Sequence, residues 1–215
     1  DIVVKEDLLF TSGYRSMSVV DVSDPADPQT LFQNEMETSC LTVVDTILYC
    51  CLRGVDIPYS TSLLSYNISS PDEPVLLDSI FLASTRNNYY PAKDIVFYND
   101  HLLISLWIDD GHGDSPGPII LVVDATNPRD LRSEEINCVE PSPFNAIYVR
   151  DDKLIGVGGS QGYIYDISNL DSIRLINSWD IGEHRQATSF LYENLLFIGG
   201  DALLVYDISD YDRSE

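Results

Sequence analysis

Positive charge is scarce in this sequence. The 215 residues include 12 Lys and Arg against 35 Asp and Glu, which gives a formal net charge of −23. A chain this acidic repels phosphate backbones and anionic membranes at long range. We therefore expect no nucleic-acid partner.

Long apolar runs are absent too. The longest unbroken aliphatic run is IILVV, residues 119–123, far short of the roughly 20 residues that span a bilayer as a helix. The chain opens with Asp1 and has no basic-then-apolar leader, so a signal peptide either was removed or never existed. We expect no insertion into a membrane.

Familiar catalytic and metal-binding signatures are also missing. The sequence contains no G-x-S-x-G motif, no zinc-spaced set of Cys and His, and no phosphate-binding Gly loop. Apolar residues at helical spacing never extend beyond about two turns. The chain is nevertheless 44% hydrophobic, which is enough for the core of one domain.

One phrase, in contrast, is abundant and returns five times along the chain. Its copies are VVDVSDPADPQTL, LSYNISSPDEPVLL, LVVDATNPRDLRS, YIYDISNLDSIRLI and LVYDISDYDRSE. They align on residues that lie 41 to 57 positions apart, a period typical of repeat architectures: Asp21, Asn67, Asp124, Asp166 and Asp207. A second phrase precedes each copy and consists of two apolar runs around a tight polar turn, which predicts a hairpin.

Together the two phrases predict four short antiparallel strands per repeat. Stacked four-stranded units of this length are the blades of a β-propeller, which surround a central channel. We therefore predict an all-β fold, a single β-propeller domain of five four-stranded blades with the last blade incomplete in this chain. The expected blades cover about residues 1–39, 40–92, 93–144, 145–187 and 188–215.

The ends of the chain lead to two further predictions. Asp1 enters within the first strand of blade 1, and Glu215 stops after the third strand of blade 5. We therefore expect the natural protein to continue upstream of Asp1. We also favour a closed ring in which blade 5 packs beside blade 1, because an open arc would leave two large apolar patches in water.

Three of the copies, MSVVDVSDPADPQTL, GYIYDISNLDSIRLI and LLVYDISDYD, resemble the LVIVD repeat. The resemblance covers essentially the whole chain and implies a propeller of bacterial and archaeal proteins, often secreted or at the cell surface and mostly without an assigned activity. An extracellular or cell-surface location is thus implied. This chain departs from the pattern at Asn67, which replaces the aspartate, and at Leu170 and Tyr211, which replace a proline of the earlier copies.

The recurring Asp has a structural interpretation. Asp and Asn side chains accept hydrogen bonds from the backbone amides of the turn that follows them. We therefore assign Asp21 and its counterparts to the scaffold and look for function elsewhere.

Long and variable connections gather on one rim of the predicted propeller. Binding residues tend to lie in loops held by a rigid scaffold, and Tyr and Arg are enriched at interface hot spots. Trp107 either stacks on a sugar or covers a blade edge. The candidate ligand-binding residues, which suit a protein, a carbohydrate or an anionic group, are Arg53, Arg86, Asn87, Tyr89, Tyr90, Trp107, His184 and Arg185.

The loop of blade 3 is a candidate calcium site. Asp109, Asp110 and Asp114 lie among glycines, and carboxylate oxygens are the ligands that Ca²⁺ prefers. The alternatives are a solvated acidic loop and a transition metal shared by His112 and His184. His101 is expected in a turn on the opposite face.

Two functions follow from these residues. The first is a non-catalytic binding or surface-interaction module that uses the loop-bearing rim. The alternative is an extracellular hydrolase or lyase acting on a polysaccharide, with Asp109, Asp110, His112 or His184 as acid-base groups at the channel mouth. Fold alone does not decide between them, and we assign no catalytic residue.

Three cysteines fall within one predicted hairpin. A two-residue turn at Asp45 pairs Cys40 with Cys51, whereas a slip of one residue selects Cys50. Directly opposed positions lie within disulfide range. The hairpin therefore holds either a disulfide, which indicates an oxidising compartment, or buried free thiols, and Cys138 is predicted to be free.

Overall fold

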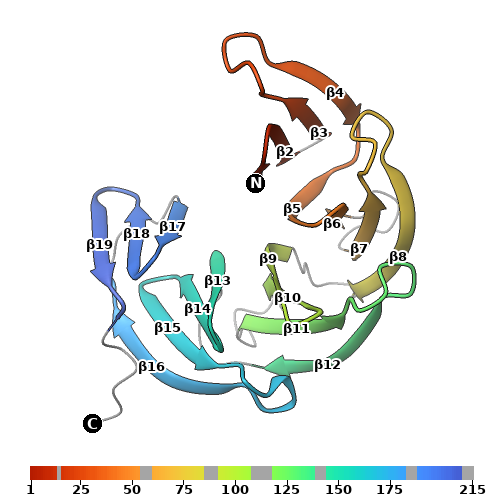
Figure 1. The fold of residues 1–215 in the computed structure, drawn as a ribbon. Helices are drawn as coiled ribbons and strands as arrows, with labels where there is room; N and C mark the ends of the chain where they lie inside the picture. The colour runs from red at the N-terminus through yellow and green to blue at the C-terminus, as the bar shows by residue number, and fades with distance from the viewer. Residues whose placement is uncertain are drawn as a thin grey trace.

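The computed structural model of the chain contains five antiparallel sheets that follow one another around a central axis (Figure 1). It describes residues 1–13, 16–53, 60–84, 92–107, 118–138, 144–182 and 188–209. The predicted all-β propeller of five blades is confirmed, and the described residues contain no helix beyond one 3₁₀ turn.

The strands follow one another in chain order within each blade. Blade 1 contains β1 (Ile2–Lys5), β2 (Leu8–Gly13), β3 (Ser16–Asp21) and β4 (Gln29–Asn34). Blade 2 contains β5 (Thr38–Val44), β6 (Ile47–Arg53), β7 (Ser60–Asn67) and β8 (Val75–Ser84). Blade 3 contains β9 (Ala92–Tyr98), β10 (His101–Trp107), β11 (Pro118–Asp124) and β12 (Arg132–Cys138).

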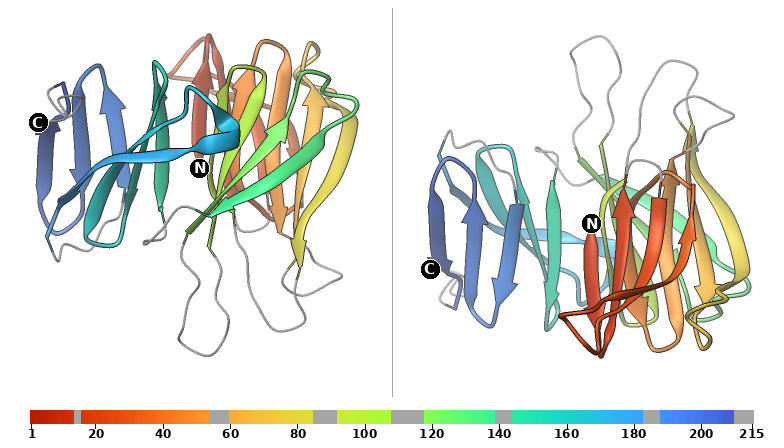
Figure 2. Two further views of the ribbon diagram at one scale, coloured as in Figure 1. Left: turned by 90° about the horizontal axis from the view of Figure 1, so that it is seen from below. Right: turned by 90° about the horizontal axis from the view of Figure 1, so that it is seen from above.

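Blades 4 and 5 continue the pattern. Blade 4 contains β13 (Ala146–Arg150), β14 (Lys153–Gly158), β15 (Gln161–Asp166), the 3₁₀ turn η1 (Leu170–Ser172) and β16 (Arg174–Asp180). Blade 5 contains β17 (Thr188–Tyr192), β18 (Leu195–Gly199) and β19 (Leu203–Asp207). Within the described part of the chain, blade 5 thus has three strands, as predicted. In every blade the first strand lies nearest the axis and the last on the outside (Figures 1 and 2).

Two-residue turns join the first and second strands of all five blades. The first turn residue has a positive φ of 45° to 54° in each of them: Glu6, Asp45, Asn99, Asp151 and Glu193. Left-handed backbone at this point matches the twist of a tight hairpin. His101, which we expected in such a turn, is instead the first residue of β10.

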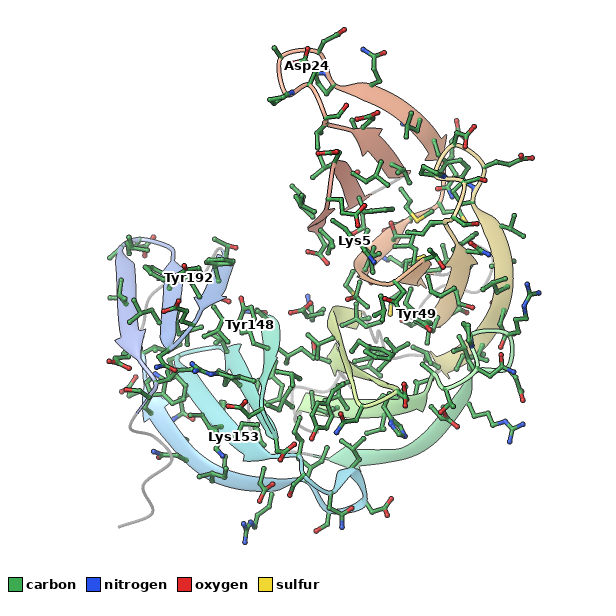
Figure 3. The ribbon with its side chains drawn as sticks, viewed as in Figure 1. Lys5, Asp24, Tyr49, Tyr148, Lys153 and Tyr192 are labelled. Atoms are coloured by element: carbon green, nitrogen blue, oxygen red, sulfur yellow. The ribbon has the colours of Figure 1, made fainter. Side chains whose placement is uncertain are left out.

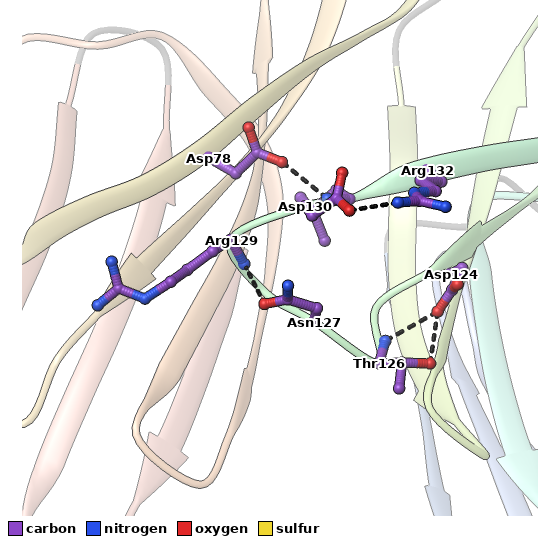
Figure 4. Close-up of polar contacts among 8 residues, drawn as sticks. Asp78, Asp124, Thr126, Asn127, Arg129, Asp130 and Arg132 are labelled. Carbon is purple, nitrogen blue, oxygen red and sulfur yellow. Dashed lines mark hydrogen bonds and ion pairs between the residues drawn. The ribbon is translucent and has the colours of Figure 1, made fainter.

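The recurring Asp or Asn stabilises the next turn in all five copies, as predicted. Its Oδ1 accepts a hydrogen bond from the backbone N–H two residues later, at 2.8 to 3.1 Å. In blade 3, Asp124 also accepts from the hydroxyl of Thr126 at 2.5 Å (Figure 4). Just before this residue, the pairing between third and fourth strands shifts register in each four-stranded blade, and such bulges bend the outer strand.

The hydrophobic core lies between the blades. Four clusters of buried residues join blades 1 and 2, 2 and 3, 3 and 4, and 4 and 5. At the joint of blades 1 and 2, for example, Phe10 and Val19 share a cluster with Leu41 and Leu48. Each sheet therefore depends on its neighbours for burial, as in other repeat architectures.

The circuit of blades is open between blade 5 and blade 1, so the predicted closed ring is wrong (Figure 1). β1 and β2 pack against β5, and β17 packs against β13, but within the described residues no comparable packing joins blade 5 to blade 1. Ile2 and Phe190 accordingly remain exposed. The four joints between successive blades bury apolar side chains, whereas the described faces of blades 5 and 1 at the opening are not packed on each other.

The cysteine prediction is half correct. Cys40 and Cys51 lie directly opposite each other in β5 and β6, as the two-residue turn implied. The sulfurs are nevertheless free thiols, and Cys50 is free as well. All three are completely buried, so the structure favours the alternative of buried thiols over a disulfide. The side chain of Cys138 lies outside the described residues.

Candidate functional site

The innermost strands of the five blades enclose a cavity of about 460 Å³ around the axis. Its wall is built from β1, β5, β9, β13 and β17 and from the residues that directly precede them. The polar residues of the wall are Asp1, Ser39, Thr42, Lys93, Asp94, Asn145, Tyr148, Thr188 and Ser189. Most come from the first half of their strands, so they lie near the end of the cavity at which β5, β9, β13 and β17 begin.

Asp94 is the half-buried carboxylate of this wall. Its Oδ2 accepts a hydrogen bond from the backbone N–H of Ile147 in the next blade at 2.8 Å, and its Oδ1 accepts one from Ile95 at 2.8 Å. Burial raises the pKa of Asp94 to about 6, although the two amides act in the opposite direction. The pKa of this carboxyl therefore lies above the ordinary value of 3.8 for aspartate.

The same position of blade 1 makes a similar contact. Oδ2 of Asp1 accepts a hydrogen bond from the backbone N–H of Leu41 in blade 2 at 3.1 Å. In both cases a channel carboxylate joins its blade to the innermost strand of the next one. Asp94 thus has a structural role besides any contact with a ligand.

Two cations, Lys93 of β9 and Arg53 of β6, lie near each other. Burial, and then the positive charge of Arg53, lower the pKa of the Lys93 ammonium. Arg53 ends β6 and forms an ion pair with Glu37 at 2.8 Å. The two basic side chains are therefore close enough to interact, on a protein whose overall charge is strongly negative.

Hydroxyl groups complete the wall on the side of blades 4 and 5. The hydroxyls of Tyr148 and Ser189 are hydrogen-bonded to each other at 2.9 Å across the joint of the two blades. Burial raises the pKa of Tyr148 to about 12, so the phenol stays protonated and is able to donate or accept. Thr188 and Asn145 supply further neutral polar groups.

This set of groups suits binding through hydrogen bonds. Hydroxyls, an amide and one ammonium match a ligand rich in hydroxyl or carbonyl groups. The pKa of Asp94 is raised to about 6, toward the range that proton transfer favours. Both of its oxygens already accept backbone amides.

Sequence reasoning missed Asp94, Lys93 and Tyr148. The predicted binding residues were taken mainly from the loops of the rim. A usable signal existed, since Lys93 and Asp94 directly follow the polar run TRNNYYPA, residues 85–92. Polar residues at the start of an innermost strand face the channel mouth.

The predicted ligand-binding residues are only partly described. Arg53 is close enough to Lys93 to lower its pKa, but it is not among the residues that line the cavity. Trp107 is the last residue of β10, with its side chain outside the described residues. The remaining candidates lie outside the described residues: Arg86, Asn87, Tyr89, Tyr90, His184 and Arg185.

The predicted calcium ligands Asp109, Asp110 and Asp114 lie outside the described residues too, as does His112. Among the residues that the structure does describe, no group of three or more His, Cys, Asp or Glu is arranged to hold a metal. In that same part of the chain, no helix is long and apolar enough to cross a membrane.

Comparison with known proteins gives a fold and no family. No family model matches the chain, and no curated protein matches it in sequence. Among solved structures the chain is similar to a "putative 6-phosphogluconolactonase" from Bacteroides fragilis, with a TM-score of 0.67 and 10% sequence identity. It is also similar to a "putative 6-phosphogluconolactonase" from Bacteroides uniformis, with a TM-score of 0.68 and 9% sequence identity. The fold is a β-propeller. Each match covers 96% of this chain and 65% of the other, so this chain spans less than two thirds of either neighbour.

Proposed function

We propose that the protein is a non-catalytic binding module that takes a protein or carbohydrate ligand at the loop-bearing rim. The observation that carries this proposal is the 460 Å³ cavity, whose wall includes the hydrogen-bonding residues Tyr148, Ser189 and Lys93. Loops on a rigid scaffold and a concave polar floor are a common basis for recognition. The rim residues of the proposed site are Arg53, Arg86, Asn87, Tyr89, Tyr90, Trp107, His184 and Arg185.

A second candidate is a hydrolase or lyase acting on a polysaccharide. Its support is the carboxyl of Asp94, whose pKa of about 6 lies in the range of acid-base groups, together with the rim residues Asp109, Asp110, His112 and His184. The names of the structural neighbours add a lactone of a phosphorylated sugar acid to the substrates worth testing. Two such groups must converge on one substrate bond for this candidate to hold.

Calcium and an extracellular location belong to the same proposal. Ca²⁺ would be held by the carboxylates of Asp109, Asp110 and Asp114. The location rests on the resemblance of the repeats to the LVIVD family. The calcium site is tested by calcium titration of the melting temperature, since an ion that binds only the folded state raises it and EDTA reverses the rise.

Calorimetric titration with oligosaccharides and peptides tests the binding site. We expect Tyr148→Phe and Asn145→Ala to weaken binding of a ligand that the wild-type protein binds. Arg132→Ala is the control, because Arg132 is exposed on the outer strand β12 and pairs with Asp130. Equal affinity of all four proteins places the ligand elsewhere, and binding of no compound in the panel contradicts the proposal.

Turnover assays separate the enzyme from the binding module. The substrates are polysaccharides and 6-phosphogluconolactone, and the variant is Asp94→Asn. Activity that is present in the wild type and lost in Asp94→Asn supports the enzyme and overturns the non-catalytic assignment. Ligand binding without turnover in either protein supports the binding module.

A further inference from the structure

One copy of the recurring turn differs from the others at its aligned residue. Four copies have aspartate there, whereas blade 2 has Asn67. Asn67, Ile68 and Ser69 form the sequence N-I-S, and no other Asn of the chain has Ser or Thr two residues later. An Asn-x-Ser sequence in which x is not proline is the acceptor motif of N-linked glycosylation. Aspartate in the other four copies has no nitrogen to accept a sugar.

The two reactive groups of this motif are free in the folded chain. Oδ1 of Asn67 accepts the backbone N–H of Ser69 at 2.8 Å, which holds the turn as in the other blades. Nδ2 of Asn67 and the hydroxyl of Ser69 make no hydrogen bond to another described residue. In blades 3 and 4, by contrast, the hydroxyls of Thr126 and Ser168 donate to the aspartate of the motif at 2.5 and 2.6 Å. The turn of blade 2 therefore keeps its shape without the groups that glycosylation needs.

The turn that begins at Asn67 lies on the surface. Asn67 is half-buried, and Ser69 and Ser70 are exposed. In blade 1 the same turn lies at the outer margin of the molecule, where Asp24, the counterpart of Ser70, is labelled (Figure 3). Arg53, one of the proposed rim residues, pairs near the start of β7, whereas Asn67 ends this strand. A glycan on Asn67 would therefore leave the proposed ligand site open.

The residue opposite Asn67 is unusual as well. On the outer strand of blade 2 this residue is Val75, which is 57% exposed. Arg174 at the same position of blade 4 forms an ion pair with Asp166 at 3.1 Å. Blade 2 thus has a neutral amide beside an exposed apolar side chain. The residues opposite the motif aspartate in blades 1, 3 and 4 are all polar: Gln29, Arg132 and Arg174.

We propose that Asn67 is an acceptor for N-linked glycosylation and that its first sugar covers Val75. Directly opposed residues of antiparallel strands lie about 4.5 to 5.5 Å apart, which is within reach of a sugar ring. The C–H groups of the ring cover the valine, and burial of this apolar surface is favourable. The site is separate from the ligand site, but it rests on the proposed extracellular location, since the motif is used in secreted proteins.

The donor is an oligosaccharide whose first sugar is joined through C1 to a lipid phosphate. Nδ2 of Asn67 forms a bond to C1 as the bond between C1 and the phosphate oxygen breaks. The amide nitrogen loses one proton, and the lipid phosphate leaves with the electron pair of the broken bond. The hydroxyl of Ser69 belongs to the motif that the transferring enzyme recognises.

Secretion of the 215-residue chain from a host that performs N-glycosylation tests the acceptor. We expect the intact mass of the wild type to exceed that of the chain by one oligosaccharide, and PNGase F to remove this mass and convert Asn67 into aspartate. Asn67→Asp keeps the turn residue of the other blades and should carry no glycan. Ser69→Ala should lose the glycan as well. Ser69→Thr is the matched control and should keep it, because threonine retains the hydroxyl.

Two results overturn the acceptor assignment. One is a secreted wild-type chain without added mass. The other is a glycan that persists in Asn67→Asp, which would lie elsewhere on the chain. Circular dichroism melting checks that each variant is folded. Ligand binding is measured separately, so failure of the acceptor leaves the proposed ligand site standing.

Melting temperatures test the contact with Val75. Removal of the glycan by PNGase F should lower the melting temperature of the wild type by about 2 °C, and by less in Val75→Ser, which has little apolar surface to cover. Leu76→Ser is the matched control. Leu76 is 51% exposed in the same strand, but consecutive side chains of a strand point to opposite faces, so this variant should lose as much as the wild type. An equal loss in all three proteins would contradict the contact.

Discussion

The carboxylate of Asp94 accepts a hydrogen bond from the backbone N–H of Ile147 at 2.8 Å, which joins the innermost strands of blades 3 and 4. The bond lies in the wall of the channel cavity. There, burial raises the pKa of Asp94 by more than the hydrogen bonds from two backbone amides lower it. The pKa of the folded carboxyl is about 6, above the ordinary value of 3.8.

This shift predicts a pH-dependent contribution to stability. Between pH 4 and 6 the folded state binds the proton more tightly than the unfolded state, so the free energy of unfolding falls as pH rises through this range. We expect the contribution of Asp94 to the free energy of unfolding to fall by about 1–3 kcal/mol between pH 4 and 6. Above pH 6 this contribution should stay constant. Urea denaturation of wild type and Asp94→Asn between pH 4 and 8 measures it. A difference between the two proteins that does not change with pH would contradict the assignment.

Local hydrogen bonds explain why the fold could be predicted from the sequence. The turn after Asp124 depends on residues only two positions apart, and the pairing of Cys40 with Cys51 depends on the length of one turn. A turn of this kind forms in every blade whose sequence contains the same turn residues. Five copies of the same local rules therefore specified the strands and their order within each blade.

Ring closure and the cavity could not be predicted in this way. The angle between sheets results from side-chain packing across each joint, such as the stacking of Tyr49 in blade 2 against Phe97 in blade 3. These contacts differ from joint to joint and involve residues far apart in sequence. The raised pKa of Asp94 likewise depends on how several innermost strands converge, which no single repeat contains.

The turn aspartates predict a contrast between two substitutions. Asp124 accepts hydrogen bonds from the backbone N–H and the hydroxyl of Thr126. Asn67 makes the corresponding amide contact in blade 2 at 2.8 Å, so Asp124→Asn should be nearly neutral. Asp124→Ala should lower the free energy of unfolding by about 1–2 kcal/mol. Urea midpoints at neutral pH compare them, and equal midpoints for the two variants would show that the bond does not contribute.

The hydrogen bonds at this turn also determine whether acidification raises or lowers the stability that Asp124 contributes. Contacts with Thr126 lower the pKa of Asp124, so the folded state binds a proton less readily than the unfolded state. The stabilisation is therefore present above the ordinary pKa and is lost as pH falls. Asp124→Asn should lose less stability than the wild type on acidification.

The buried thiols predict slow labelling. Burial raises the pKa of Cys50 to about 12, and a hydrogen bond with Cys40 together with burial raises the pKa of Cys51. Only the thiolate reacts, so Cys40, Cys50 and Cys51 should react at neutral pH only as the protein opens. A Cys138→Ser background removes the fourth thiol. Three thiols should titrate in denaturant without reductant, and a count of one would reveal a disulfide.

Gly162 predicts a steric effect at the joint of blades 4 and 5. It lies opposite Trp179 in the pairing of β15 with β16, and a Cβ at this position would overlap the indole ring. Trp179 packs against the buried cluster of that joint, so it has little room to move. We expect Gly162→Ala to lower the free energy of unfolding by about 1–3 kcal/mol.

Gly13→Ala is the matched control, because its Cβ would lie 3.9 Å from the nearest atom, the carbonyl oxygen of Ser16. That variant should be neutral or slightly stabilised, since alanine restricts the unfolded chain. Urea midpoints at an unchanged m-value measure both, and equal stability of the two variants would show that the Trp179 ring yields without cost.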